Sequence, residues 1–176
     1  MKRTILIISA LLAIVSCAEP QKYQIFGEIE TLEGDRDPNG YQIFLVPLHD
    51  QSREAVDSVV VKDNKFYFEG TECHMADIRM SNKARYGYQN LLVVTEPGKI
   101  KVHIGPVSHG GGTPQNDSLQ VWKNLTEKKN HFVAVEPSIE ARREFLRKYS
   151  LRSQEMARNL PDGPLKEFLN QYFPKK

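Results

Sequence analysis

The sequence predicts a mainly β protein: an antiparallel β-sandwich of about seven strands, followed by an extension of three helices. Short runs in which apolar and polar side chains alternate fill residues 23–104, with turn residues between them. After residue 114, apolar residues instead recur every three or four positions. With 40% hydrophobic and 26% charged residues, the composition is that of an ordinary globular protein. We expect a signal peptide at 1–16, a tether at 17–22, a sandwich domain at 23–115 and a helical extension at 116–176.

The N-terminus has the features of a bacterial lipoprotein signal. Lys2 and Arg3 precede an apolar run of 11 residues that ends at Val15. This run is too short to cross a bilayer, which needs about 20 residues, but it suits a secretory signal peptide. The residues Ile-Val-Ser-Cys at 14–17 resemble a lipobox, and this resemblance implies that Cys17 becomes the first mature residue and carries lipid. An ordinary cleaved signal peptide is the alternative.

The charge and the cysteine content of the mature chain restrict the kinds of partner and the cellular compartment that we expect. Removal of Lys2 and Arg3 leaves 22 basic and 22 acidic residues, so charge gives no case for nucleic-acid binding. A lipid on Cys17 would attach the protein to a membrane without spanning it. By resemblance to the sorting of Gram-negative lipoproteins, Ala18 after the cysteine favours the outer membrane, facing the periplasm. One thiol, Cys73, then remains, and it cannot form an internal disulfide.

Seven segments between residues 23 and 104 are typical of short strands. They are rich in β-branched and aromatic residues and are bounded by turn residues. Lys-Asp-Asn at 62–64 predicts a hairpin between the third and fourth strands, and Pro97-Gly98 predicts a turn in which the glycine has a positive φ. Strands at this spacing favour an antiparallel sandwich. The predicted strands are 23–29, 41–46, 56–61, 65–68, 75–80, 90–94 and 99–104.

Three helices are predicted after residue 114. We expect Asn116 and Asp117 to cap the first helix, Ser138 to begin the second, and Asp162-Gly163-Pro164 to separate the second from the third. Each helix has an apolar stripe at helical spacing. The stripes consist of Trp122, Leu125 and Phe132; of Ala141, Phe145, Tyr149, Met156 and Leu160; and of Leu165, Phe168, Leu169, Tyr172 and Phe173.

Several short motifs in a fixed order resemble one family. They are Ile-Phe-Gly-Glu-Ile at 25–29, Asp-Ser before three valines at 57–61, Lys-Phe-Tyr-Phe-Glu-Gly at 65–70, Glu-Pro-Gly-Lys-Ile at 96–100 and Gly-Thr-Pro-Gln-Asn-Asp at 112–117. Together they resemble the domain of unknown function at the N-terminus of thiol–disulfide oxidoreductase lipoproteins, ahead of an AhpC/TSA–thioredoxin-like domain. The resemblance covers about residues 23–125, and the helices resemble the linker into the thioredoxin-like domain. Since the chain has no Cys-x-x-Cys, the resemblance does not imply redox activity here.

The sequence has no complete catalytic or metal-binding constellation. Asp35 to Gly40 matches the first half of a calcium loop, but Val46 stands where the loop needs a bidentate glutamate, so we expect a polar loop without an ion. Cys73 and His74 could supply a thiolate or two metal ligands, although a buried or inert cysteine is the favoured interpretation. We therefore predict no catalytic residue, metal or cofactor, and keep Cys73 as a possible reactive thiol.

Other polar segments have ordinary structural interpretations. Glu28 and Glu30 share one strand face, which we expect to be solvated. The glycine-rich run at 109–113 lacks the Lys-Ser/Thr of a phosphate loop and is expected to let the chain turn toward the helices. Six basic residues of the second helix could contact anionic lipid or an acidic partner, but a solvated face with Glu140–Arg143 and Glu144–Lys148 pairs is favoured. The six are Arg142, Arg143, Arg147, Lys148, Arg152 and Arg158.

Two functions from different classes follow. The first is a non-enzymatic, lipid-anchored module that binds a partner protein or a small ligand in the cell envelope. A loop with Arg85, Tyr86 and Tyr88 would offer one binding edge. The second is a redox accessory that works with a separate thioredoxin-like partner, through Cys73 if its thiol is reactive. A third possibility is a truncated relic that keeps its fold and its location but has no activity. The absence of a catalytic constellation favours the binding module.

Overall fold

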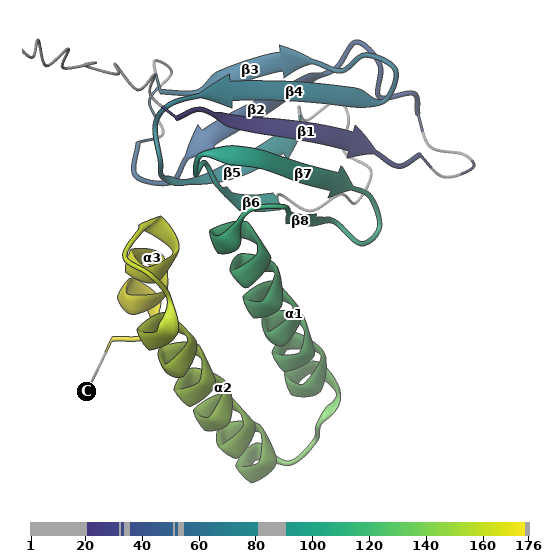
Figure 1. Ribbon diagram of the computed structural model, residues 1–176. Helices are drawn as coiled ribbons and strands as arrows, with labels where there is room; N and C mark the ends of the chain where they lie inside the picture. Colours follow the sequence, from purple (N-terminus) through teal and green to yellow (C-terminus); the bar gives the residue numbers. More distant parts are fainter. Residues whose placement is uncertain are drawn as a thin grey trace, which may run out of the picture.

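The computed structural model describes residues 21–174, apart from 32, 34–35, 51, 53–54 and 81–90. Within them, eight strands form two packed sheets and three helices follow (Figure 1). This confirms the predicted sandwich with a helical extension. The predicted signal peptide, Cys17, Asp35 and the Arg85–Tyr88 loop lie outside the described residues. The elements are β1 (Tyr23–Ile29), β2 (Gln42–Pro47), β3 (Asp57–Val60), β4 (Lys65–Gly70), β5 (Met75–Met80), β6 (Leu91–Val94), β7 (Gly98–Ile104), β8 (His109–Gly111), α1 (Pro114–Val135), α2 (Ile139–Asn159) and α3 (Pro164–Tyr172).

The core of the sandwich follows the alternation seen in the sequence. One sheet has the order β4-β1-β7-β8 and the other β3-β2-β5-β6. Along β1, Tyr23, Ile25 and Ile29 are buried, whereas Phe26 and Glu28 face outward. Fully burying one such apolar side chain contributes about 1.5–3 kcal/mol. The opposite sheet supplies Ile43, Leu45, Ala76, Ile78, Leu91 and Val93 to the same cluster.

The segment from residue 56 to residue 70 differs from the predicted hairpin. Lys62 and Lys65 exchange two backbone hydrogen bonds of 2.9 Å, and Asp63 and Asn64 between them have φ of 52° and 58°, so the tight turn is present. Beyond it the strands part: β3 pairs with β2, and β4 pairs with β1 in the other sheet. The predicted strand pairing is wrong because the chain crosses between the sheets here. Val61, just before the turn, is buried in the core.

The alternation of apolar and polar residues does not predict two features of the first sheet. β1 and β7 pair in parallel, from Tyr23 opposite Gly98 to Ile29 opposite Ile104, so this sheet is mixed. The glycine-rich run forms an eighth strand, β8, which pairs with β7. Its sequence, His-Gly-Gly, has no apolar alternation; β8 pairs along the edge of β7, and the amide of Gly110 donates to the Gln120 side chain of α1. At the turn into β7, Gly98 has the predicted positive φ, 128°.

The first helix begins two residues earlier than predicted. Pro114 occupies its first turn and Thr113 is the N-cap residue, without a side-chain hydrogen bond. Asp117 does not cap the helix by itself; its carboxylate accepts a 2.7 Å hydrogen bond from the amide of Gly112. The start of α2 is as predicted, because Ser138 Oγ accepts a hydrogen bond from the amide of Ala141. No helix in the described part of the chain is long and apolar enough to cross a membrane.

A buried polar junction joins α1 to the sandwich. Glu96 Oε1 accepts hydrogen bonds from the amides of Gln115 (2.6 Å) and Asn116 (3.1 Å), in the first turn of α1. The Asn116 side chain bonds both backbone groups of Val94, accepting from its amide at 2.9 Å and donating to its carbonyl at 2.8 Å. Gln115 Oε1 accepts in turn from the amide of Leu165, at the start of α3. The predicted capping residue Asn116 therefore works as a strand-to-helix bridge.

A second apolar cluster lies around this junction. It combines the sheet residues Met75 and Val94 with residues of all three helices, so that the helices pack onto one end of the sandwich. Trp122 of α1 meets two aromatic rings of the C-terminal segment, Phe168 at 5.7 Å and Phe173 at 6.5 Å between centroids. The helical members of the cluster are Leu119, Ala157, Leu160, Leu165 and Leu169.

We predict that Asn116→Ala destabilises the protein by about 2–4 kcal/mol, because it leaves the buried amide and carbonyl of Val94 without partners. Urea unfolding followed by circular dichroism measures this change. Asn124→Ala is the matched control, since this asparagine also lies on α1 but is exposed; it should change the stability by no more than about 0.5 kcal/mol. Equal effects of the two substitutions would contradict the proposed bridge.

Candidate functional site

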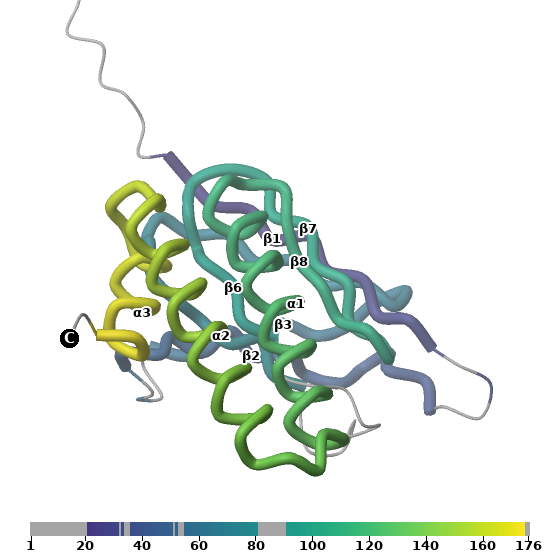
Figure 2. Tube along the Cα trace, turned by 90° about the horizontal axis from the view of Figure 1, so that it is seen from below, coloured from purple at the N-terminus to yellow at the C-terminus, as the bar shows by residue number. Residues whose placement is uncertain are grey.

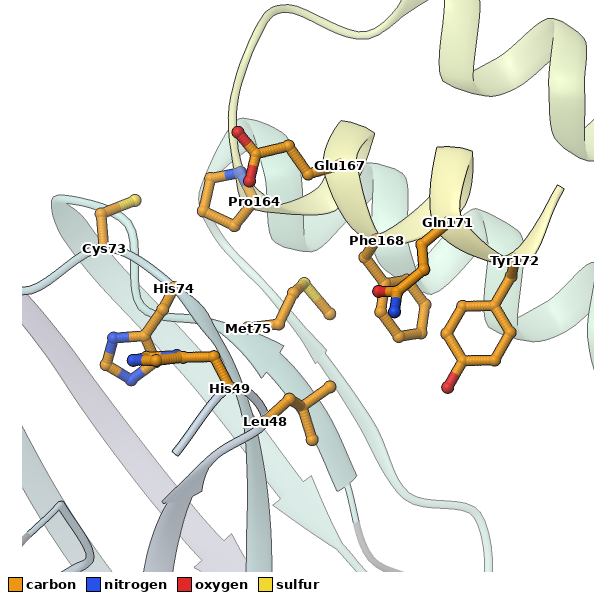
Figure 3. Close-up of a pocket in the computed structure, with 10 residues that line it drawn as sticks. All are labelled: Leu48, His49, Cys73, His74, Met75, Pro164, Glu167, Phe168, Gln171 and Tyr172. Atoms are coloured by element: carbon orange, nitrogen blue, oxygen red, sulfur yellow. The ribbon is translucent and has the colours of Figure 1, made fainter. Parts of the chain in front are cut away.

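An open cleft of about 660 Å³ lies between one end of the sandwich and α3 (Figure 3). Its sandwich side comes from the segments just after β2 and just before β5, which are far apart in sequence. Apolar side chains meet polar ones in this cleft, as in many ligand sites. The lining residues are Leu48, His49, Cys73, His74 and Met75 from the sandwich, and Pro164, Glu167, Phe168, Gln171 and Tyr172 from α3.

Cys73 lies at the rim of this cleft and is exposed. Of the two alternatives expected, a buried or an inert cysteine, the structure contradicts the buried one: Cys73 precedes β5 in a connecting loop, and the chain enters the core at Met75. Partial burial of the thiol, together with the negative charge of Glu96, raises its pKa. Since the thiolate is the nucleophilic form, this environment makes Cys73 accessible but less reactive than an ordinary cysteine at neutral pH.

Two histidines lie side by side on the sandwich wall of the cleft. The rings of His49 and His74 meet edge to face, with 5.1 Å between centroids. Burial lowers the pKa of His74, and the neighbouring His49 lowers it further. His74 Nε2 is buried and has no hydrogen-bond partner within the part of the chain that the structure describes. The lowered pKa of His74 favours its neutral imidazole form.

The other candidate residues that the structure describes make local contacts. Glu28 is exposed, and the carboxylate of Glu30, just after β1, lies 3.0 Å from Nε2 of His103 on β7. Asp37 accepts hydrogen bonds from the backbone and side chain of Asn39, which gives a local turn. Among the described residues, no three His, Cys, Asp or Glu side chains lie close enough together to hold a metal ion.

The distal parts of α1 and α2 form a second candidate site. Figure 1 shows the two helices running side by side away from the sandwich, with α3 beside only the near end of α2. None of residues 120–152, which we call the arm, is buried. A thin seam holds its helices together: the rings of Phe132 and Phe145 stack at 4.2 Å, and Thr126 bonds the Tyr149 hydroxyl at 2.8 Å. Several apolar side chains of the arm are exposed, namely Val121, Val135, Ile139, Leu146 and Leu151.

The charges of α2 only partly follow the predicted pairs. Glu144 accepts two 2.8 Å hydrogen bonds from Arg147 and lies 3.5 Å from the predicted partner Lys148. These contacts lower the pKa of Glu144 to about 2, chiefly through the hydrogen bonds from Arg147. Arg143 has no ion-pair partner among the described residues. The basic side of α2 is thus not fully neutralised within the protein.

Sequence analysis missed the exposed residues of the arm. It identified the α2 stripe through Phe145 and Tyr149, which does face α1. The sequence does contain a second apolar stripe on this helix, because Ile139 and Leu146 are seven residues apart and so share a face. Whether such a stripe is covered depends on the position of α3, which the periodicity of α2 alone does not give.

A family model described as a domain of unknown function, DUF4369, matches residues 23–119. No curated protein and no solved structure matches the chain. The matched region spans both sheets and the start of α1, and it ends at Leu119, the last buried residue before the arm. Because the match covers more than half of the sequence, the chain belongs to the DUF4369 family of domains of unknown function.

Proposed function

We propose that this protein is a lipid-anchored, non-enzymatic interaction module of the cell envelope, which uses its arm to bind another protein. The observation that carries the proposal is that the arm, residues 120–152, has no buried residue but several exposed apolar ones. A surface helix normally buries its apolar stripe against its own domain, and most of its stability comes from that contact. Ile139 and Leu146, seven residues apart, share one exposed face of α2, and an apolar helix face that its own domain leaves uncovered marks an interaction surface.

The direction of the arm supports this role. A lipid on Cys17 would lie six residues before Tyr23, so the extended tether spans at most about 20 Å. Figures 1 and 2 both place the tip of the arm, where α1 turns into α2, away from the start of β1. Since α1 has 22 residues, a helix of this length reaches about 33 Å. The arm of an outer-membrane protein held in this way would point into the periplasm.

We predict that Cys17→Ser abolishes membrane attachment. The wild-type protein should incorporate radiolabelled palmitate and sediment with the outer membrane, because its acyl chains contribute about 0.8 kcal/mol for each buried CH₂ group. The variant should incorporate no label. Cys73→Ser serves as the control and should behave like the wild type. Palmitate incorporation that persists in Cys17→Ser would contradict the proposed anchor.

We predict that making the arm polar removes partner binding and leaves the fold intact. The joint substitutions Val121→Gln, Ile139→Gln, Leu146→Gln and Leu151→Gln change only exposed side chains, so each should alter stability by no more than about 0.5 kcal/mol. Chemical crosslinking in intact cells measures binding. The control carries Val60→Gln and Val107→Gln, at exposed positions on the sandwich. Partner complexes that survive the arm variant but disappear in the control would assign binding to the sandwich instead.

A redox accessory is the second candidate function, and the exposure of Cys73 favours it. An ordinary cysteine is only a few per cent thiolate at pH 7, and the raised pKa of Cys73 lowers this fraction further. We predict that iodoacetamide labels Cys73 more slowly than free cysteine at pH 7, with a rate that rises as pH increases and the thiol ionises. Cys73→Ser gives the background. Fast labelling at pH 7, with a Cys73-dependent mixed disulfide to a thioredoxin-like protein in cells, would favour the redox function over the binding module.

A further inference from the structure

One stripe of α2 is covered near the sandwich and uncovered along the arm. Ile139, Arg143, Leu146 and Ser150 follow one another at i, i+4, i+7 and i+11, so they share a face of the helix. The same spacing continues to Ser153 and Ala157, which are both fully buried. By contrast, Ile139 is 58% exposed and Leu146 41% exposed.

The cover over the near end of this stripe is α3. Ala157 belongs to one apolar cluster with Leu165 and Leu169, which are four residues apart on α3. The carbonyl of Pro174, just past the end of α3, accepts a hydrogen bond from Gln154. Phe173 packs against Tyr149 with 5.5 Å between ring centroids. The C-terminal segment therefore covers this side of α1 and α2 only as far as Tyr149. Beyond it Ile139 and Leu146 are exposed, and we call this uncovered side of the two helices the groove.

The uncovered groove carries positive charge. Besides Arg143 on α2, it has Lys129 on α1, which lies over the ring of Tyr149 at 5.3 Å. Residues 114–176 hold 12 lysines and arginines against 8 acidic residues, whereas the tether and sandwich, residues 18–113, hold 10 against 14. The arm itself, residues 120–152, holds 8 lysines and arginines against 4 acidic residues, so two arms would repel each other, which disfavours an arm-to-arm dimer. An occupant with acidic side chains would be attracted.

We propose that the groove between α1 and α2 beyond the end of α3 is a docking site for an acidic amphipathic helix of a partner protein. The helix would place apolar residues against Ile139 and Leu146 and acidic residues beside Arg143 and Lys129, and so continue the three-helix packing that α3 begins. This inference rests on the proposed binding function and specifies the surface and the partner. The groove lies on the part of the molecule that points away from the proposed anchor, which favours a protein over the anchoring bilayer.

Site-specific photocrosslinking in the cells that make the protein tests the proposal. A photoreactive amino acid replaces Leu146, in the groove, or Leu151, which is 51% exposed on another face of the same helix. We expect position 146, but not position 151, to crosslink to one protein. Mass spectrometry should place the linkage in a helix with apolar residues at three- and four-residue spacing and acidic residues beside them.

Charge reversal then tests the chemistry of the contact. Arg143→Glu should lower the crosslink at position 146 by about tenfold, and an acidic-to-lysine substitution in the linked helix should restore it. Arg158→Glu, at an exposed position on the face of Leu151, is the matched control and should have no effect. Circular dichroism confirms that each variant is folded. Equal crosslinking at 146 and 151, a product that is lipid or a second copy of this chain, or a product indifferent to Arg143→Glu would each overturn the proposal.

These results separate this inference from the proposed function. If the four glutamine substitutions in the arm remove the partner while Arg143→Glu does not, the arm binds a protein, but not through the acidic contact proposed here. If neither set of substitutions affects any complex, both proposals fail.

Discussion

The carboxylate of Glu96 is the constraint on which the arrangement of sheets and helices depends. It is buried at the end of the strand segment, and a buried carboxylate is tolerated only when it accepts hydrogen bonds. The first turn of α1 supplies two amide donors at the positive end of the helix dipole. Because Thr113 gives no side-chain cap, these amides would otherwise lack partners. The direction of α1, and therefore of the arm, is fixed by this mutual requirement.

Two of the five motifs that resemble the family, at 96–100 and 112–117, meet at this junction. Glu96 and Asn116, from two motifs 20 residues apart, bond directly, and Gly98 and Gly112 both have positive φ there. A Cβ on Gly112 would come within 2.7 Å of the Lys99 carbonyl, so only glycine fits this approach. The motifs thus build the joint between strand and helix. Since the family match ends at Leu119, the arm lies outside the shared domain, which suits a part that selects a particular partner.

The sequence predicts local structure better than long-range pairing. Alternation identifies β1 and β7, because one face of each strand is buried, but nothing local indicates that they pair in parallel. The turn at Asp63 and Asn64 is readable from its residue types, yet its strands join different sheets. The candidate sites likewise depend on long-range contacts that the sequence does not predict. Cys73 lies in a loop, and its place at a cleft depends on α3, whose docking is set by Gln115 and the apolar cluster far away in sequence.

The arm is ordered before any partner binds, and this affects how it can bind. The stacked rings of Phe132 and Phe145 fix its two helices, and Arg142 closes the turn between them by donating to the carbonyl of Glu136. For the proposed partner helix, a preorganised groove would spare the entropy of ordering the receptor, so that a short helix with few apolar contacts would still bind measurably. Apolar contacts of this kind are not selective by themselves. Charges such as Arg143, which the protein does not neutralise, would then reject partners that lack acidic residues at the matching positions.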